Sequence, residues 1–383
     1  MKQRLFYYLL SLMMNFTSYA GEFHYLVRSP KALLMGDAYT AIANDAYTLF
    51  YNPAALSRHG GLSVYFVNPD VGVTNVLDDL DKFEDFPERD AAAIADRILG
   101  TPLHLRLGGT PGLKMESFGM NLFAGVNADV VLRNAIHPNL EINYRLDRGI
   151  IAGYAFSMGN GARNIGGKRR KGGGGGAGTK VSFGGAFKTM NRQGIKSNFD
   201  LFGLELINKI TESDSTDMDE IRKSLGYSYG KGYGFDIGTE FTWKSNISML
   251  NIAFSALDIG NTTFRIEEGS RQITEQKMTL NTGIAWSQDF FILDYTVAID
   301  FHPMTEPIDF MRKIHVGVEI GLPIVSVLFG WNGGYVSYGL TVEFWPISLY
   351  AGFYGVEIGS EYGQAEGKRG IVYLSLLDFE FSV

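Results

Sequence analysis

The chain has 383 residues, of which 45% are hydrophobic and 13% aromatic, and its net charge is −7. An acidic chain lacks the electrostatic attraction that nucleic acid requires, so no nucleic-acid partner is expected. The apolar content argues against disorder. The absence of cysteine excludes disulfides, thiolate metal sites and cysteine nucleophiles. The length suits either two or three soluble domains or one large barrel.

The beginning of the chain has the pattern of an export signal. Basic residues precede an apolar run over 5–14, and Ser18 and Ala20 are small residues at the positions that a signal peptidase reads. This run is too short to cross a bilayer as a helix, which takes about 20 residues. A buried N-terminal helix is the alternative. We predict a signal peptide over residues 1–20.

Small residues then gather over 35–56, where alanines permit close packing. Asn52 followed by Pro53 is a favourable N-cap and first turn for a short helix. This block, with its Asn52-Pro53-Ala54 box, resembles the hatch of the FadL-type superfamily of outer-membrane proteins. The resemblance implies that residues 21–60 form a hatch inside a barrel. The hatch either only closes the barrel or contacts a ligand directly.

Two later segments suggest loops at a membrane surface. Apolar spacing predicts a short helical insertion near 77–99, which either covers the outer mouth or packs on a loop. The basic residues Lys168, Arg169, Arg170 and Lys171 precede five glycines, without the Gly-Lys-Ser/Thr sequence of a phosphate loop. A flexible outer loop is the default reading. Contact with anionic surface lipid or with a protein partner is the functional alternative.

Strand-like alternation dominates the chain from Tyr233 onward. Tyr233, Phe235 and Ile237 share one face, and polar residues and glycines occupy the other. Long strands with aromatic residues near their ends favour a membrane barrel over a soluble sandwich. We therefore predict an all-β fold over 61–383, a transmembrane antiparallel β-barrel. Up to 16 strands are counted in the sequence, whereas the FadL-type resemblance implies 14.

Link lengths give the expected orientation, with short periplasmic turns and long outer loops. Short links are predicted at 146–149, 244–246, 288–289, 321–323 and 345–346, and long links near 69–101, 158–178, 258–275, 303–311 and 357–367. In the last strand, the alternation predicts one outward row: Ile371, Tyr373, Leu377, Phe379, Phe381 and Val383.

Ionisable residues on the polar faces of these strands are the candidate lumen residues. They are Asp236, Glu240, Asp294, Asp300, His302, His315, Glu319 and Glu343, against few inward bases such as Lys313. This predicts either an acidic path that disfavours anions or an ordinary interior of salt bridges. The six histidines show no close metal-ligand spacing, so no metal or other cofactor is expected. No Gly-x-Ser-x-Gly sequence occurs, and no enzyme activity is predicted.

The C-terminal third carries a second resemblance, to the PorV-like branch of the same superfamily. The matching stretches are 317–319 with 322–323, 330–335 and 354–359. FadL-type members carry hydrophobic molecules, whereas PorV-like members act as shuttles or scaffolds in protein secretion. We predict passive uptake of small hydrophobic molecules across a Gram-negative-type outer membrane, with outer-membrane lipid and a small hydrophobic ligand as partners. A secretion or surface protein partner is the alternative.

Overall fold

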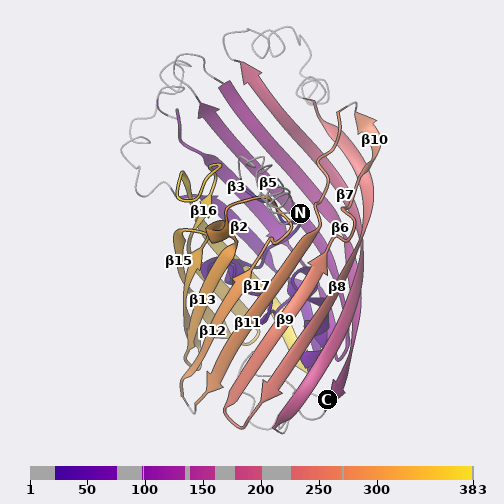
Figure 1. The fold of residues 1–383 in the computed structure, drawn as a ribbon, viewed down its shortest axis with the longest axis vertical. Helices are drawn as coiled ribbons and strands as arrows, with labels where there is room; N and C mark the ends of the chain where they lie inside the picture. The colour runs from indigo at the N-terminus through magenta and orange to yellow at the C-terminus, as the bar shows by residue number, and fades with distance from the viewer. Residues whose placement is uncertain are drawn as a thin grey trace, which may run out of the picture.

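The computed structural model describes residues 22–75, 97, 99–133, 139–159, 177–200, 226–269, 271–290 and 292–381. Within them, one sheet curls into a barrel that closes where β1 pairs with β17 (Figure 1). The strands are β1 Leu62–Val67, β2 Pro69–Thr74, β3 Leu103–Gly109, β4 Gly112–Met115, β5 Phe118–Arg133, β6 Asn139–Gly159, β7 Gly178–Asp200, β8 Ser228–Lys244, β9 Ser248–Leu257, β10 Arg265–Gly269, β11 Thr279–Asp289, β12 Asp294–Phe301, β13 Ile314–Gly321, β14 Val325–Asn332, β15 Tyr335–Phe344, β16 Ile347–Glu357 and β17 Glu366–Phe381.

Not every labelled strand crosses the barrel separately. β1 and β2 keep one register along β17, and β3 and β4 keep one register along β5, so each pair is one interrupted strand. β10 pairs only with the first residues of β8, beyond the stretch of β8 that pairs with β9. The described residues therefore form a closed antiparallel barrel of 14 spanning strands, which confirms the predicted fold class. The sequence tally of 16 was too high.

Side chains alternate across the wall as the sequence predicts. On β8, Tyr233 is 65% exposed and Phe235 59%, whereas Asp236 and Glu240, which follow them and face the other side, are 1% exposed. A closed barrel leaves no spanning strand with an unpaired edge, which is the condition for a sheet in hydrocarbon. An outer surface this apolar suits contact with lipid. Among the described residues, no helix is long and apolar enough to cross a membrane.

Residues 22–61, here called the hatch, lie inside the barrel (indigo in Figure 1). Its helical pieces are α2 Pro30–Leu34, η1 Thr48–Phe50 and η2 Pro53–Arg58; a further 3-10 turn, η4 Phe310–Lys313, precedes β13. α2 packs on β14 to β17, and η2 packs on β5 to β8. The hatch therefore contacts both halves of the wall and supplies most of the buried apolar core.

Two paired glycines on the inner wall make room for η2. Gly184 and Gly238 are register partners on β7 and β8. A Cβ at Gly184 would lie 2.4 Å from the Ala54 nitrogen, and one at Gly238 would lie 1.9 Å from Asn52 Oδ1. Side chains at these positions would collide with the hatch, so the glycines shape its seat.

The predicted N-cap is present at this seat. Asn52 Oδ1 accepts a hydrogen bond of 3.0 Å from the Ala54 nitrogen, and Pro53 occupies the first helical position. Asn52 Nδ2 also donates to the Thr239 carbonyl oxygen at 3.4 Å. One side chain thus begins the 3-10 helix and ties it to β8.

The predicted short turn at 146–149 is wrong, because β6 runs straight through it. Asp147 resembles a turn residue in the sequence, yet its side chain points inward and accepts a hydrogen bond of 2.6 Å from Arg192 Nε. The connection between β5 and β6 falls at 134–138, outside the described residues. A buried ion pair on the inner face was mistaken for a turn.

The outward row predicted for the last strand is also partly wrong. Ile371 and Tyr373 are 2% and 4% exposed and face inward, whereas Val372 is 50% exposed. Leu377 has a φ of +62° and is exposed. This left-handed residue interrupts the alternation, so the parity read from the end of the strand does not hold at its beginning.

Two predicted long links also differ from the structure. Residues 69–74 belong to β2, so the link near 69–101 begins later. The link after β6 begins at Gly159 and ends at Gly178, and Gly178 pairs with Lys244 beside the short 245–247 turn. The basic run Lys168–Lys171 was predicted in an outer loop, but both ends of its link lie at the rim of the short turns. Residues 1–20, the basic run itself and most of 77–99 lie outside the described residues.

A luminal cavity and an apolar groove that meet at His104

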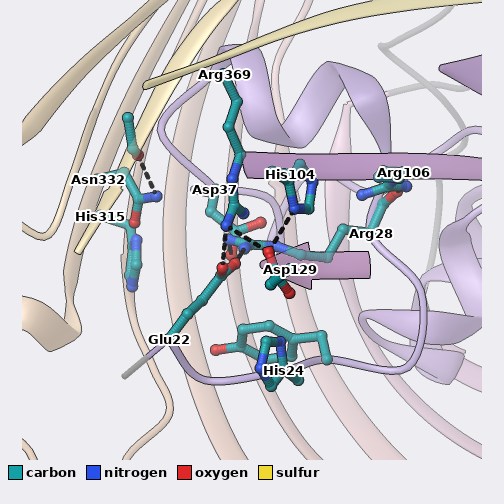
Figure 2. Close-up of polar contacts among 12 residues, drawn as sticks. Glu22, His24, Arg28, Asp37, His104, Arg106, Asp129, His315, Asn332 and Arg369 are labelled. Atoms are coloured by element: carbon teal, nitrogen blue, oxygen red, sulfur yellow. Dashed lines mark hydrogen bonds and ion pairs between the residues drawn. The ribbon is translucent and has the colours of Figure 1, made fainter. Parts of the chain in front are cut away.

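A polar cavity of about 50 Å³ lies between the first hatch residues and the wall (Figure 2). A space of this size holds a few water molecules, given roughly 10–15 Å³ for each by the same kind of measure. Its ionisable lining comes from the hatch and from β2, β3, β5, β6 and β17: Glu22, His24, Arg28, Asp70, His104, Arg106, Asp129, Arg145 and Arg369.

Every arginine of this lining faces a carboxylate. Arg369 Nη2 lies 2.7 Å from Glu22 Oε2 and 3.3 Å from Asp129 Oδ1. The other pairs are Arg106 with Asp70, Arg145 with Asp147 and Arg28 with Asp37. Buried charges are tolerated when they are paired in this way, and the cavity therefore carries no large excess of either sign.

His104 and Asp129 are register partners on β3 and β5. His104 Nδ1 lies 2.7 Å from Asp129 Oδ1, as Figure 2 shows. An ionised carboxylate only accepts hydrogen bonds, so Nδ1 carries the proton and the neutral ring has its lone pair on Nε2. Nε2 is buried and has no hydrogen-bond partner. Such an unsatisfied group costs about 1–3 kcal/mol.

An apolar groove of about 380 Å³ runs over the outer face of the same strands. Val73, Leu105 and Ala128 form one outward row across β2, β3 and β5, and Leu103 with Val130 forms the next. The groove and the cavity share one residue, His104. This is where the lipid-facing surface and the lumen approach each other.

The strand ladder ends at this point. Val73 and Leu105 are the last register partners of β2 and β3. Beyond them, Thr74 Oγ1 accepts a hydrogen bond of 2.6 Å from the His104 nitrogen and donates one of 3.1 Å to the Pro102 carbonyl oxygen. Between β2 and β3 a side chain therefore replaces the backbone pairing, whereas on its other side His104 stays paired with Asp129 in the ladder of β3 and β5.

The hatch is anchored on the opposite side by a buried cluster of Asp37, His302 and His315, whose ligand-type atoms lie within 4.8 Å of one another. The sequence did not indicate this grouping, because the hatch supplies one member. Asp37 is occupied by Arg28 and by Tyr51 OH at 3.3 Å.

Hydrogen bonding in this cluster opposes metal binding. His315 Nδ1 lies 3.0 Å from the Gly36 carbonyl oxygen, and its Nε2 lies 2.9 Å from the His302 carbonyl oxygen. Both nitrogens point at backbone carbonyl oxygens, so neither is directed at a position shared with Asp37 and His302. The cluster is therefore an anchor for the hatch.

Three of the sequence-predicted acids also bind the hatch. Arg58 Nε lies 2.7 Å from Glu240, and Lys31 Nζ lies 2.7 Å from Glu319. Asp300 Oδ2 accepts hydrogen bonds from the backbone nitrogens of Tyr39 and Thr40 at 2.8 and 2.6 Å. These acids belong to the inner wall and hold the plug in place.

The remaining predicted acids have other partners or are exposed. Asp236 pairs with Lys188 at 2.8 Å, Glu343 accepts from Tyr350 OH at 3.1 Å, and Asp294 is exposed at the start of β12. Most of the buried acids form ion pairs with basic residues of β3, β6, β7, β17 and the hatch. Of the two interpretations that the sequence left open, these contacts favour the interior of salt bridges over the acidic path that disfavours anions.

The protonation of the hatch follows from burial. Burial lowers the pKa of His24 to about 4; Glu22 opposes this shift and Arg145 adds to it. Burial would raise the pKa of Asp37, but the Arg28 guanidinium beside it holds the pKa below its usual value. At neutral pH the hatch therefore contains a neutral His24 and an ionised Asp37.

His104 and Asp129 were missed by the sequence analysis. Leu103, Leu105 and Leu107 alternate with His104 and Arg106, which is a signal that would have placed both polar residues inward. Their partnership with Asp129 depends on a register that the sequence does not contain.

No protein-family model matches the chain, and no curated protein matches it significantly. Among solved structures, the chain is similar to the toluene transporter TodX of P. putida, with a TM-score of 0.41 and 10% identity over 94% of this chain and 100% of the other. The monoaromatic hydrocarbon channel CymD gives 0.41 and 12% over 94% and 100%. The toluene transporter TbuX of Ralstonia pickettii gives 0.40 and 9% over 93% and 100%.

Proposed function

We propose that the chain is an outer-membrane barrel for passive uptake of small hydrophobic molecules in a Gram-negative-type bacterium. The observation that carries the proposal is the meeting of the luminal cavity and the lipid-facing groove at His104. A scaffold that only filled its barrel would have no need of an outer apolar groove that shares a lining residue with its luminal cavity.

The proposed path enters from the rim of the long links and leaves through the wall beside His104 into the groove. Because the cavity of about 50 Å³ is smaller than the cargo, the side chains that line it have to move as the molecule passes. The lower lumen is closed by η2, which is seated against Gly184 and Gly238 and paired through Arg58 to Glu240. Beside His104, the hydroxyl of Thr74 takes the place of backbone pairing between β2 and β3. The cargo leaves through this part of the wall, and the hatch remains in place.

The groove is large enough for the proposed cargo. A dry cavity of about 150 Å³ is sufficient to hold benzene, and the groove measures about 380 Å³. The two transporters and the channel named above act on toluene and monoaromatic hydrocarbons, so toluene is the natural first probe. Outer-membrane lipid is then the immediate acceptor of the cargo.

Uptake of toluene into proteoliposomes tests the proposal. Ala128→Trp should fill the groove and slow uptake several-fold. Ala351 is an exposed, lipid-facing alanine on β16, and Ala351→Trp is the matched control that should leave uptake unchanged. Equal uptake by liposomes with and without the wild-type protein would refute the function, and equal effects of the two tryptophans would refute the path.

The alternative function, a scaffold for a secretion or surface protein, requires such a protein to bind the barrel. The similar structures named above give no support to a secretion partner. Co-purification of a stoichiometric protein with the detergent-extracted barrel would favour the scaffold over the transporter. The basic run Lys168–Lys171 remains a proposed contact for anionic lipid, now at the short-turn rim. The signal peptide over 1–20 is also still a prediction, which N-terminal sequencing of the mature protein would check.

A further inference from the structure

We propose that His104 accepts a hydrogen bond from a hydroxyl group of the cargo, so that the site selects small apolar molecules carrying one hydroxyl, such as alkylphenols. The inference rests on the proposed function and names its substrate class. It starts from the buried Nε2 of His104, which has no partner among the described residues.

The chemistry of Nε2 is set by its neighbour. His104 Nδ1 lies 2.7 Å from Asp129 Oδ1, so the neutral ring carries its proton on Nδ1. Nε2 is then an acceptor and requires a donor from the ligand. Arg369 Nη2, which lies 3.3 Å from the same Asp129 oxygen, helps to hold this carboxylate in position. A hydrocarbon offers no donor, whereas a hydroxyl does.

The charges around the cavity argue against an ionised ligand head. Each guanidinium of the lining already faces a carboxylate, as with Arg106 and Asp70 at 2.6 Å. A carboxylate head would compete with these acids, and an ammonium head would compete with the arginines. Arg28 Nε is a further buried donor without a hydrogen-bond acceptor among the described residues. A hydroxyl both donates and accepts, so it suits a lining with an unsatisfied acceptor and an unsatisfied donor.

The volumes of the cavity and of the groove indicate where each part of the ligand binds. The cavity of about 50 Å³ is too small for an aromatic ring but admits a hydroxyl, whereas the groove of about 380 Å³ admits the ring. Val73, Leu105 and Ala128 supply apolar walls for the ring. The ring then lies against the wall from outside while its hydroxyl reaches His104.

Equilibrium binding to the detergent-solubilised full chain tests this assignment with three matched probes: toluene, p-cresol and p-toluate. One net hydrogen bond is worth about 1 kcal/mol, so p-cresol should bind about fivefold more tightly than toluene. His104→Phe should abolish this difference while toluene affinity stays the same. His104→Gln, whose amide oxygen can accept, should restore part of it. Ala351→Phe is the control on the lipid face.

A second measurement does not depend on variants. In wild-type protein labelled with ¹⁵N-histidine, p-cresol should shift the Nε2 resonance of His104, and toluene should not. Equal affinity for p-cresol and toluene, or tighter binding of p-toluate, would overturn the inference. If toluene still enters proteoliposomes in that case, only the hydroxyl selectivity fails; if none of the probes enters, the proposed function fails with it.

Discussion

The side-chain amide of Asn68 forms hydrogen bonds with both backbone groups of Thr110. Asn68 Oδ1 accepts from the Thr110 nitrogen at 2.8 Å, and Asn68 Nδ2 donates to the Thr110 carbonyl oxygen at 3.0 Å. Each residue is followed by a proline, which has no backbone donor. The amide thus replaces a peptide group where β1 passes into β2 and β3 into β4.

Asn68→Ala should therefore destabilise the barrel. It leaves the buried nitrogen of Thr110 without this partner, which costs about 1–3 kcal/mol. The Thr110 carbonyl oxygen keeps the hydrogen bond that it accepts from Asn121 Nδ2 at 3.2 Å. Thermal unfolding in detergent should show a lower midpoint than the wild type. Asn246→Ala, at an exposed turn position, is the control and should leave the midpoint unchanged. Equal midpoints for the two variants would mean that the amide has no structural role.

Adjacent glycines on β7 test the seat of the hatch. Gly184→Ala places a Cβ 2.4 Å from the Ala54 nitrogen, whereas a Cβ at Gly185 meets only the Asp236 carbonyl oxygen at 3.8 Å. We expect Gly184→Ala to loosen η2 and to raise the protease sensitivity of the hatch. Gly185→Ala should match the wild type. Similar cleavage of both variants would contradict a close-packed seat.

A reversible disulfide tests whether the hatch must move. Ser57 Oγ lies 2.6 Å from Ser182 Oγ, between η2 and β7, and the chain contains no other thiol. The double variant Ser57→Cys with Ser182→Cys should therefore form one defined bond. Because the proposed path lies at the other end of the lumen, toluene uptake should be equal in the oxidised and reduced forms. Uptake that appears only after reduction would show that cargo passes the hatch.

Acid should loosen the first residues of the hatch. Burial lowers the pKa of His24 to about 4, against about 6.5 in the unfolded chain. A lowered folded pKa gives stability that is complete above about pH 6.5 and is lost as the pH falls toward 4. Protonation would also remove the acceptor that His24 Nε2 offers to Asn143 Nδ2 at 2.9 Å.

Hydrogen exchange over residues 22–28 measures this effect, once corrected for the intrinsic pH dependence of exchange. Protection should fall between pH 6.5 and 4 in the wild type, and His24→Gln should flatten the profile. If the variant keeps the same profile, another group controls the loosening. Glu22 and Arg145 are the first to examine, since they are the charged groups with the largest effects on the pKa of His24.

The alternation of the C-terminal half was sufficient to predict its strands and their outward faces. Tyr233 and Phe235 are exposed as expected, and Asp236 is buried. The prediction went wrong where an interior ion pair resembled a turn, as at Asp147, or where a left-handed residue changed the parity, as at Leu377.

The candidate site was harder to predict than the fold. His104 and Asp129 are 25 residues apart and meet only through the register of β3 and β5. The bases that neutralise the lumen, such as Lys188 and Arg192, lie on strands where the sequence alternation is weaker. Strand faces are local properties of a sequence, whereas the partner of a side chain across a barrel depends on closure.

The placement of the hatch also constrains how the molecule assembles. The hatch immediately precedes β1, and β1 forms the closing seam with β17. Because the hatch forms ion pairs with β8 through Arg58 and with β17 through Glu22, it has to lie inside the barrel before β1 pairs with β17. We therefore expect the sheet to fold around the hatch, and the first and last strands of the chain to be the last to pair.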